Sequence, residues 1–89
     1  MAKWQIFLSP EAQKQLASIA ADQQQVLLKT LRRMGDNPFA GDVTALQGRE
    51  WKGCYRKRAG RWRLIFVPNL HQQTVEIALI LLRSEKTYR

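Results

Sequence analysis

The sequence predicts an α+β fold in which two helices pack on one face of a small sheet. Apolar residues recur with helical spacing between residues 10 and 34, and with strand spacing between residues 51 and 82. A further alternation over residues 3–8 predicts a strand ahead of the helices. The expected order is a strand, an antiparallel helix hairpin and a three-stranded antiparallel meander. With 89 residues, we expect a single domain, residues 1–89, whose small core leaves a thin margin of stability.

Each of the two expected helices has its own start signal. Residues 9–11 (Ser-Pro-Glu) supply a capping hydroxyl, a proline suited to the first helical position and an acid at the positive end of the dipole. Asp22 and Gln25 have capping-box spacing and predict the second start. Gly35 and then Pro38 predict its end. Almost no chain separates the helices, so they should fold back as an antiparallel hairpin.

Three strands are expected in the second half of the chain, over Trp51–Arg58, Trp62–Val67 and Thr74–Leu82. A turn is predicted at residues 59–60, because a glycine there tolerates the positive φ of a hairpin turn. The last strand is apolar at odd and even positions, which is typical of a strand inside a sheet or buried on both sides. Residues 36–49 contain Asn-Pro and two glycines and are expected to form a loop with little regular structure.

Positive charge is the strongest compositional signal. The chain has 15 Lys+Arg against 7 Asp+Glu, a net charge of +8, and residues 49–63 carry +6 of it. Concentrated positive charge attracts polyanions, of which nucleic acid is the commonest in cells. The alternative is an ordinary solvated basic surface, but such a surface more often mixes both signs of charge.

Strand periodicity predicts where the arginines of this segment point. A two-residue turn at residues 59–60 would set Arg58 opposite Arg61. The next pair on the same face would be Arg56 and Arg63, since directly paired residues and residues two apart share a face. The other face would receive Tyr55, Trp62, Leu64 and Phe66. Four neighbouring guanidinium groups repel one another, and binding a phosphate compensates, because each fork fits phosphate oxygens and stays charged.

Other residues offer little alternative chemistry. No Cys/His cluster suggests a metal, and no cofactor is expected. The single cysteine, Cys54, cannot form an internal disulfide, which fits a reducing cytosol. Cys54 has the same strand parity as the arginines, and their positive charge would lower the pKa of its thiol and make it reactive. The simpler interpretation is that Cys54 is a small residue with a structural role in the strand. His71 lies in an expected turn and is interpreted as a surface residue.

No apolar run approaches the ~20 residues of a membrane span, and the N-terminus lacks a secretory signal, so we expect a cytoplasmic protein.

Residues 54–66, CYRKRAGRWRLIF, resemble the strand–turn–strand core of the RelE/ParE toxin superfamily of type II toxin–antitoxin systems. That core commonly has a Tyr-basic-x-basic run, a short turn, an aromatic-Arg pair and three apolar residues. The similarity continues elsewhere in the chain, at residues 9–12 (SPEA), 37–38 (NP), 46–48 (LQG) and 83–88 (RSEKTY). The resemblance therefore covers nearly the whole chain in order and spacing.

The resemblance is closest to the RelE-like mRNA interferases, and it implies a toxin that cleaves ribosome-associated mRNA and inhibits translation. The family chemistry uses the RNA 2′-OH as nucleophile, leaves a cyclic phosphate and needs no metal. By position, the implied catalytic residues are Arg56, Arg58, Arg63, Arg83 and Tyr88. The residues expected to bind RNA are Arg49, Lys52, Lys57, Arg61 and Lys86. Strand parity turns Lys52 and Lys57 away from the arginines, toward solvent, ribosomal RNA or an antitoxin. The resemblance also implies a cognate antitoxin, acidic or amphipathic, that covers the basic face in a hetero-oligomer.

One departure from RelE affects the expected mechanism. RelE has lysines at the first two basic positions, one a candidate general base, where this chain has Arg56 and Arg58. Arginine hardly deprotonates near neutral pH, so it is a poor base. We expect these two arginines and Arg63 to stabilise the charged phosphorane, Arg83 to act on the leaving oxygen, and Tyr88 to stack on a base or assist the 2′-OH.

Two other functions remain open at this stage. One is a ParE-like, non-enzymatic inhibitor of DNA gyrase, and the other is a nucleic-acid-binding module without activity. Arg83 together with Tyr88 favours the nuclease, because the gyrase-inhibiting branch usually lacks a complete Arg/Tyr set.

Overall fold

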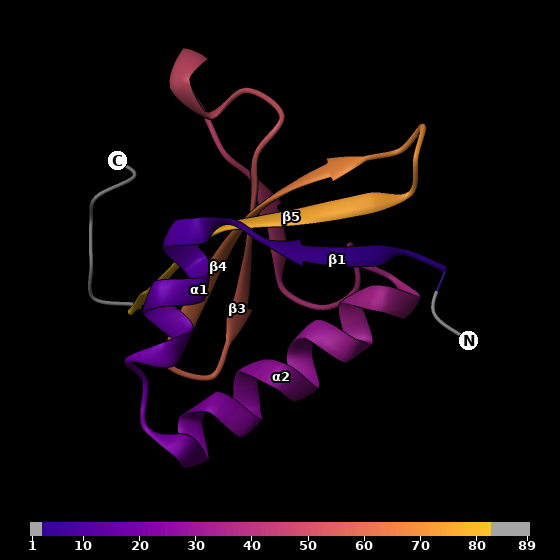
Figure 1. Cartoon of the computed structure of the whole chain (residues 1–89). Coiled ribbons are helices and arrows are strands. Elements are labelled where there is room, and N and C mark those ends of the chain that lie inside the picture. The colour runs from indigo at the N-terminus through magenta and orange to yellow at the C-terminus, as the bar shows by residue number, and fades with distance from the viewer. Residues whose placement is uncertain (1–2, 83–89) are drawn as a thin grey trace.

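The computed structural model describes residues 3–82 and shows two helices lying on one side of a curved sheet (Figure 1). The elements in chain order are β1 (Gln5–Leu8), α1 (Pro10–Ala17), α2 (Ala21–Asp36), β2 (Val43–Ala45), the 3-10 turn η1 (Arg49–Trp51), β3 (Tyr55–Ala59), β4 (Trp62–Asn69) and β5 (Thr74–Leu82). The predicted α+β class, the helix pair and the antiparallel meander β3–β4–β5 are confirmed. Over the described range, no helix combines the length and the apolar character needed to cross a membrane.

The sheet has five strands in the order β1-β5-β4-β3-β2. β1 pairs with β5 in parallel, and the other neighbours pair antiparallel. β5 thus lies between two strands, as its apolar pattern predicts. β2 was not predicted, because its three residues lie in the segment 36–49 that lacks a periodic signal. Trp51 belongs to η1, and β3 begins only at Tyr55, so the predicted start of that strand was four residues too early.

The helix starts agree with the prediction in one case and differ in the other. Ser9 caps α1, since its Oγ accepts a hydrogen bond of 3.0 Å from the Ala12 N–H. The prediction of a capping box at Asp22 is wrong, because α2 begins at Ala21 and no side chain caps its N-terminus. The two helices diverge from their short connection (Figure 1), and α1 packs on β5 while α2 packs on β1 and β3.

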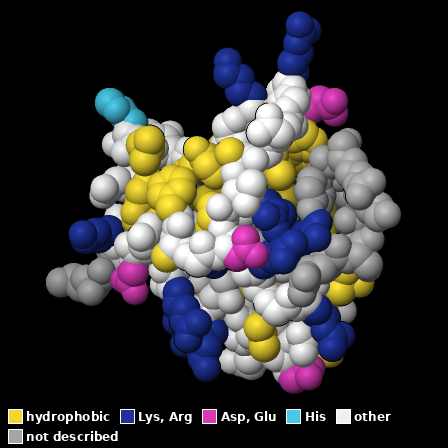
Figure 2. Space-filling model, turned by 180° about the vertical axis from the view of Figure 1, so that it is seen from behind, with side chains coloured by type: hydrophobic (Ala, Val, Ile, Leu, Met, Phe, Trp, Pro, Cys, Tyr) yellow, Lys and Arg dark blue, Asp and Glu magenta, His cyan; other side chains and the backbone are white. Residues whose placement is uncertain are grey.

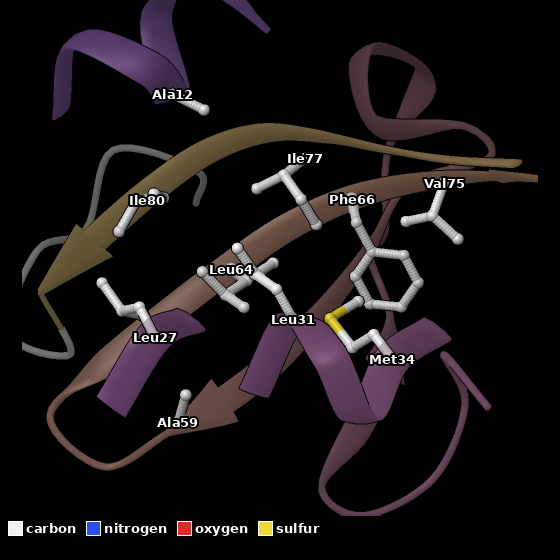
Figure 3. Packing of buried hydrophobic residues seen from close by; sticks show 10 residues of the cluster. All are labelled: Ala12, Leu27, Leu31, Met34, Ala59, Leu64, Phe66, Val75, Ile77 and Ile80. Carbon is white, nitrogen blue, oxygen red and sulfur yellow. The ribbon is translucent and has the colours of Figure 1, made fainter. Parts of the chain in front are cut away.

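The core lies between the helices and the sheet (Figure 3). Its largest fully buried side chains include Leu27 and Met34 of α2, packed over Leu64 and Phe66 of β4. Tyr55 and Trp62 are partly buried against it, so the aromatic face predicted from strand parity is confirmed. The helices therefore cover one face of the meander and leave the other for the arginines.

A bulge in β5 changes which residues face the helices. Ile65 pairs with Leu79, whereas the next residue, Phe66, pairs with Ile77. Ala78 therefore has no pairing partner on β4. The side chain of Ser9 anchors this point, since its Oγ donates to the Ala78 carbonyl at 2.8 Å. Strand parity switches at the bulge, and this is why apolar residues at both odd and even positions of β5 reach the core.

Candidate functional site

The turn between β3 and β4 lies at Gly60–Arg61, one residue later than predicted. Gly60 has φ +62, and a glycine at the first central position is the pattern of a type II′ hairpin turn. Arg58 consequently pairs with Arg63, and Arg61 is exposed in the turn outside the ladder. Arg56 pairs with Ile65, so the predicted pairings of Arg58 with Arg61 and of Arg56 with Arg63 are both wrong.

Arg56, Arg58 and Arg63 nevertheless share the face of the sheet that the helices leave uncovered. Arg58 and Arg63 are direct cross-strand partners, and Arg56 is two residues before Arg58 on β3. We call these three residues the arginine face. Figure 2 shows basic side chains gathered near the middle of the surface seen from behind, with an acidic side chain beside them.

Apolar residues lie directly beside the arginine face. Ile65, the cross-strand partner of Arg56, is fully buried, and Leu81, the partner of Arg63, is 5% exposed. Both lie on the side of the sheet away from the helices. Such surroundings lower the local dielectric and strengthen any interaction between a guanidinium group and a bound anion.

Asp42 and Thr44 hold two of the arginines, and neither was anticipated from the sequence. Asp42 Oδ2 lies 3.4 Å from Arg58 Nε, and its Oδ1 lies 3.8 Å from Arg56 Nη2. Arg56 Nη2 also donates to Thr44 Oγ1 at 2.9 Å. One carboxylate thus partly offsets the positive charge of the two arginines on β3.

The two β3 arginines differ in exposure and in how completely their donors are used. The Arg56 side chain is 13% exposed, whereas that of Arg58 is 41% exposed. Within residues 3–82, the buried Nη1 of Arg56 has no hydrogen-bond acceptor. Buried polar atoms without partners are rare in folded proteins and often mark a place where a ligand supplies the missing partner.

The remaining predicted RNA-binding residues are dispersed. Arg49 and Lys52 are exposed at η1 and just after it, and Lys52 lies in no strand, so the orientation predicted for it from strand parity does not apply. Lys57 pairs with Leu64, so it lies on the helix side of β3, away from the arginine face as predicted. Arg83, Lys86 and Tyr88 lie outside the described residues, and their roles stay predictions.

Cys54 lies just before β3 and is partly buried. Burial raises the pKa of its thiol, so the expectation that nearby arginines lower this pKa is wrong. His71 is exposed in the turn between β4 and β5, as predicted. Across residues 3–82, no three His, Cys, Asp or Glu side chains cluster as metal ligands would.

Comparison with solved structures identifies the fold. A chain of the archaeal RelE–RelB complex from Pyrococcus horikoshii OT3 superposes with a TM-score of 0.78 at 21% identity, covering 93% of this chain and 98% of that chain. A chain of the Mycobacterium tuberculosis toxin–antitoxin complex RelBE2 gives 0.81 at 16% identity, covering 90% and 98%. The YoeB/ParE toxin from Agrobacterium tumefaciens gives 0.74 at 15% identity, covering 89% and 98%. The chain therefore has a RelE-like fold.

The sequence comparison is more specific. Residues 6–87 match the family described as ParE toxin of type II toxin–antitoxin system, parDE. The chain belongs to this family and is a toxin of a type II toxin–antitoxin system. A search of curated proteins finds no significant relative.

Proposed function

We propose that this toxin is a metal-independent endoribonuclease that cleaves mRNA on the ribosome and thereby stops translation. The observation that carries the proposal is the convergence of Arg56, Arg58 and Arg63 on one face of β3 and β4. These guanidinium groups lie beside buried apolar residues and form a surface suited to a phosphodiester.

In the proposed reaction, the 2′-oxygen of the RNA forms a bond to the adjacent phosphorus, and the bond from phosphorus to the 5′-oxygen of the next nucleotide breaks. The products are a 2′,3′-cyclic phosphate and a 5′-hydroxyl. The 2′-OH loses its proton to water, with Tyr88 as a hydrogen-bond partner of that hydroxyl, and the leaving oxygen takes a proton from water with the help of Arg83. The arginine face stabilises the negative charge of the phosphorane, an effect that is typically worth 10²–10³-fold in rate for each donor.

Arg56 and Arg58 have distinct parts in this proposal. Arg56 is held by Thr44 and has an unused buried donor, so it is a preorganised contact to a nonbridging phosphate oxygen. Arg58 is more exposed and directly opposite Arg63, so these two form a clamp across the strand pair. Neither serves as a base, because guanidinium stays protonated.

The alternative function is binding and inhibition of DNA gyrase without catalysis. The match to the ParE family favours it, since the family is described by the ParE toxin. The basic surface is compatible with this alternative as well, because gyrase binding does not require a catalytic constellation.

We also propose that a cognate antitoxin covers the arginine face. Several of the similar folds were solved as toxin–antitoxin complexes, including the intact RelBE complex of Escherichia coli. The positive charge of the arginine face suits an acidic segment, whose binding should weaken as salt is added.

Two parallel assays test the proposal. The purified protein is added to coupled transcription–translation, with primer extension on the mRNA, and separately to a gyrase supercoiling reaction. The proposal expects new mRNA ends and unaffected supercoiling. If supercoiling is inhibited and the mRNA stays intact, the nuclease proposal is refuted and inhibition of gyrase is the supported function.

A further inference from the structure

A second basic surface lies on the helix side of β3, in a groove of about 550 Å³ between α2 and β3. Lys29, Arg32 and Arg33 line it from α2, and Lys57 and Arg58 line it from β3. None of the lining residues within 3–82 is acidic. We call it the α2–β3 groove.

The charges of the groove are poorly compensated. Lys29, Arg32 and Arg33 have helical spacing that places them on one side of α2, where like charges repel. Within residues 3–82, none of these three forms an ion pair or a side-chain hydrogen bond. An arrangement that keeps unpaired cations together is stabilised when an anion binds among them.

Lys57 forms the fixed wall of the groove. Its Nζ donates a hydrogen bond of 2.6 Å to the Ala40 carbonyl, and it passes close to Gly41, where an added Cβ would lie 3.1 Å from Nζ. Burial and the nearby Arg33 lower the pKa of Lys57, an effect that Asp42 partly opposes. The negative charge of a bound phosphate would offset both influences, because it favours the protonated ammonium group.

The groove and the arginine face meet at Arg58. The pairing of β2 with β3 ends at Val43 and Lys57, so β3 forms the edge of the sheet from Ala59 to the turn. Arg58 lines the groove and is also the cross-strand partner of Arg63. A polyanion can therefore pass around this free edge from one surface to the other.

We propose that the α2–β3 groove binds the phosphate backbone of the RNA strand beside the segment held by the arginine face. This rests on the proposed function for the choice of RNA as the polyanion. Protein interfaces have apolar and aromatic anchors at their centre and few lysines, whereas nucleic-acid interfaces are more polar and much more positive. Among the described residues that line the groove, only Val26 and Ala59 have apolar side chains and none is aromatic, which favours RNA over an acidic protein segment.

The test compares two double variants of equal charge change. Lys29→Gln/Arg33→Gln alters the groove, and Lys3→Gln/Lys14→Gln is the control, with all four side chains exposed. Binding of a short 2′-O-methyl RNA, which lacks the attacking hydroxyl, is measured by fluorescence anisotropy between 0.05 and roughly 0.5 M salt. The groove variant should show a log–log salt slope shallower by about 1.4, and roughly tenfold weaker binding near 0.15 M, at about 0.7 per phosphate contact.

Equal slopes and affinities in the groove variant and the control would overturn the inference. It would also be overturned if the groove variant kept full RNA affinity but lost binding to polyglutamate, since the groove would then serve an acidic protein segment. The readout needs no cleavage. If the wild type cleaves ribosome-bound mRNA while the groove variant binds RNA normally, only the groove inference is refuted. If ribosome-bound mRNA stays intact while the groove variant binds RNA more weakly, the nuclease proposal is refuted and the groove inference is supported.

Discussion

Replacing Asp42 with asparagine changes the charge of the arginine face without altering its shape. Asp42 contacts both Arg56 and Arg58, at 3.8 and 3.4 Å, and its side chain is 50% exposed. The substitution removes its negative charge and keeps a side chain of the same size. We expect the variant to bind RNA more tightly than the wild type.

The magnitude follows from the Coulomb interaction of the carboxylate with a bound phosphate. At a separation of about 6 Å in a largely aqueous environment, the repulsion is about 0.7 kcal/mol, which corresponds to about threefold in affinity. Asp42 is half exposed and Arg56 keeps its hydrogen bond to Thr44, so losing the ion pairs should cost about 1 kcal/mol of stability. The melting temperature should fall by no more than about 8 °C.

The assay is fluorescence anisotropy with a short 2′-O-methyl RNA at several salt concentrations. The Asp42→Asn variant should bind about threefold more tightly at low salt, with the difference shrinking as salt screens it. Asp22→Asn, an exposed position in the first turn of α2, makes the same charge change and should leave affinity nearly unchanged. Weaker binding by the Asp42 variant, or equal gains in both variants, would refute the reasoning.

Three further predictions concern the site and the fold. Arg63→Ala should slow RNA cleavage by about 10²–10³-fold in a single-turnover assay, and Arg63→Lys should recover part of the rate; wild-type rates in the alanine variant would remove Arg63 from the mechanism. Ser9→Ala removes the cap on Ala12 and the bond to Ala78, so the free energy of unfolding in denaturant titration should fall by about 1–2 kcal/mol, and an unchanged midpoint would contradict this. Burial is the main reason why the pKa of Lys57 in the folded protein lies below its ordinary value of 10.5. At a pH between the folded and the unfolded pKa, the unfolded state binds more protons at this lysine than the folded state does. The contribution of Lys57 to the free energy of unfolding therefore rises with pH in that window. The stability of the wild type relative to Lys57→Met should therefore increase with pH in that window, and a flat or falling difference would oppose it.

Strand periodicity was enough to predict that Arg56, Arg58 and Arg63 share a face. The predicted turn was wrong by one residue, which moved the partner of Arg58 from Arg61 to Arg63. A shift of two residues in register preserves the side on which each side chain lies, because the period of a strand is two. The face was therefore predicted correctly although the pairing was not.

Features that depend on tertiary contacts were not predictable in the same way. Asp42 lies in a segment without periodic signal, and only the pairing of β2 with β3 brings it to the arginines. The bulge at Ala78 shows itself only once β5 is paired with β4. The basic residues of α2 do carry a helical spacing that the sequence displays, but their proximity to Lys57 follows from how α2 crosses the sheet.

The most direct test of the central claim uses ribosome-bound mRNA carrying one 2′-deoxynucleotide at the position of cleavage. If the arginine face stabilises attack by the 2′-OH, the wild type cuts the all-ribose mRNA to leave a cyclic phosphate and leaves the deoxy-substituted mRNA intact. The Arg58→Ala variant should cut the all-ribose mRNA far more slowly. Equal cleavage of both mRNAs, or wild-type cleavage by Arg58→Ala, would contradict the account.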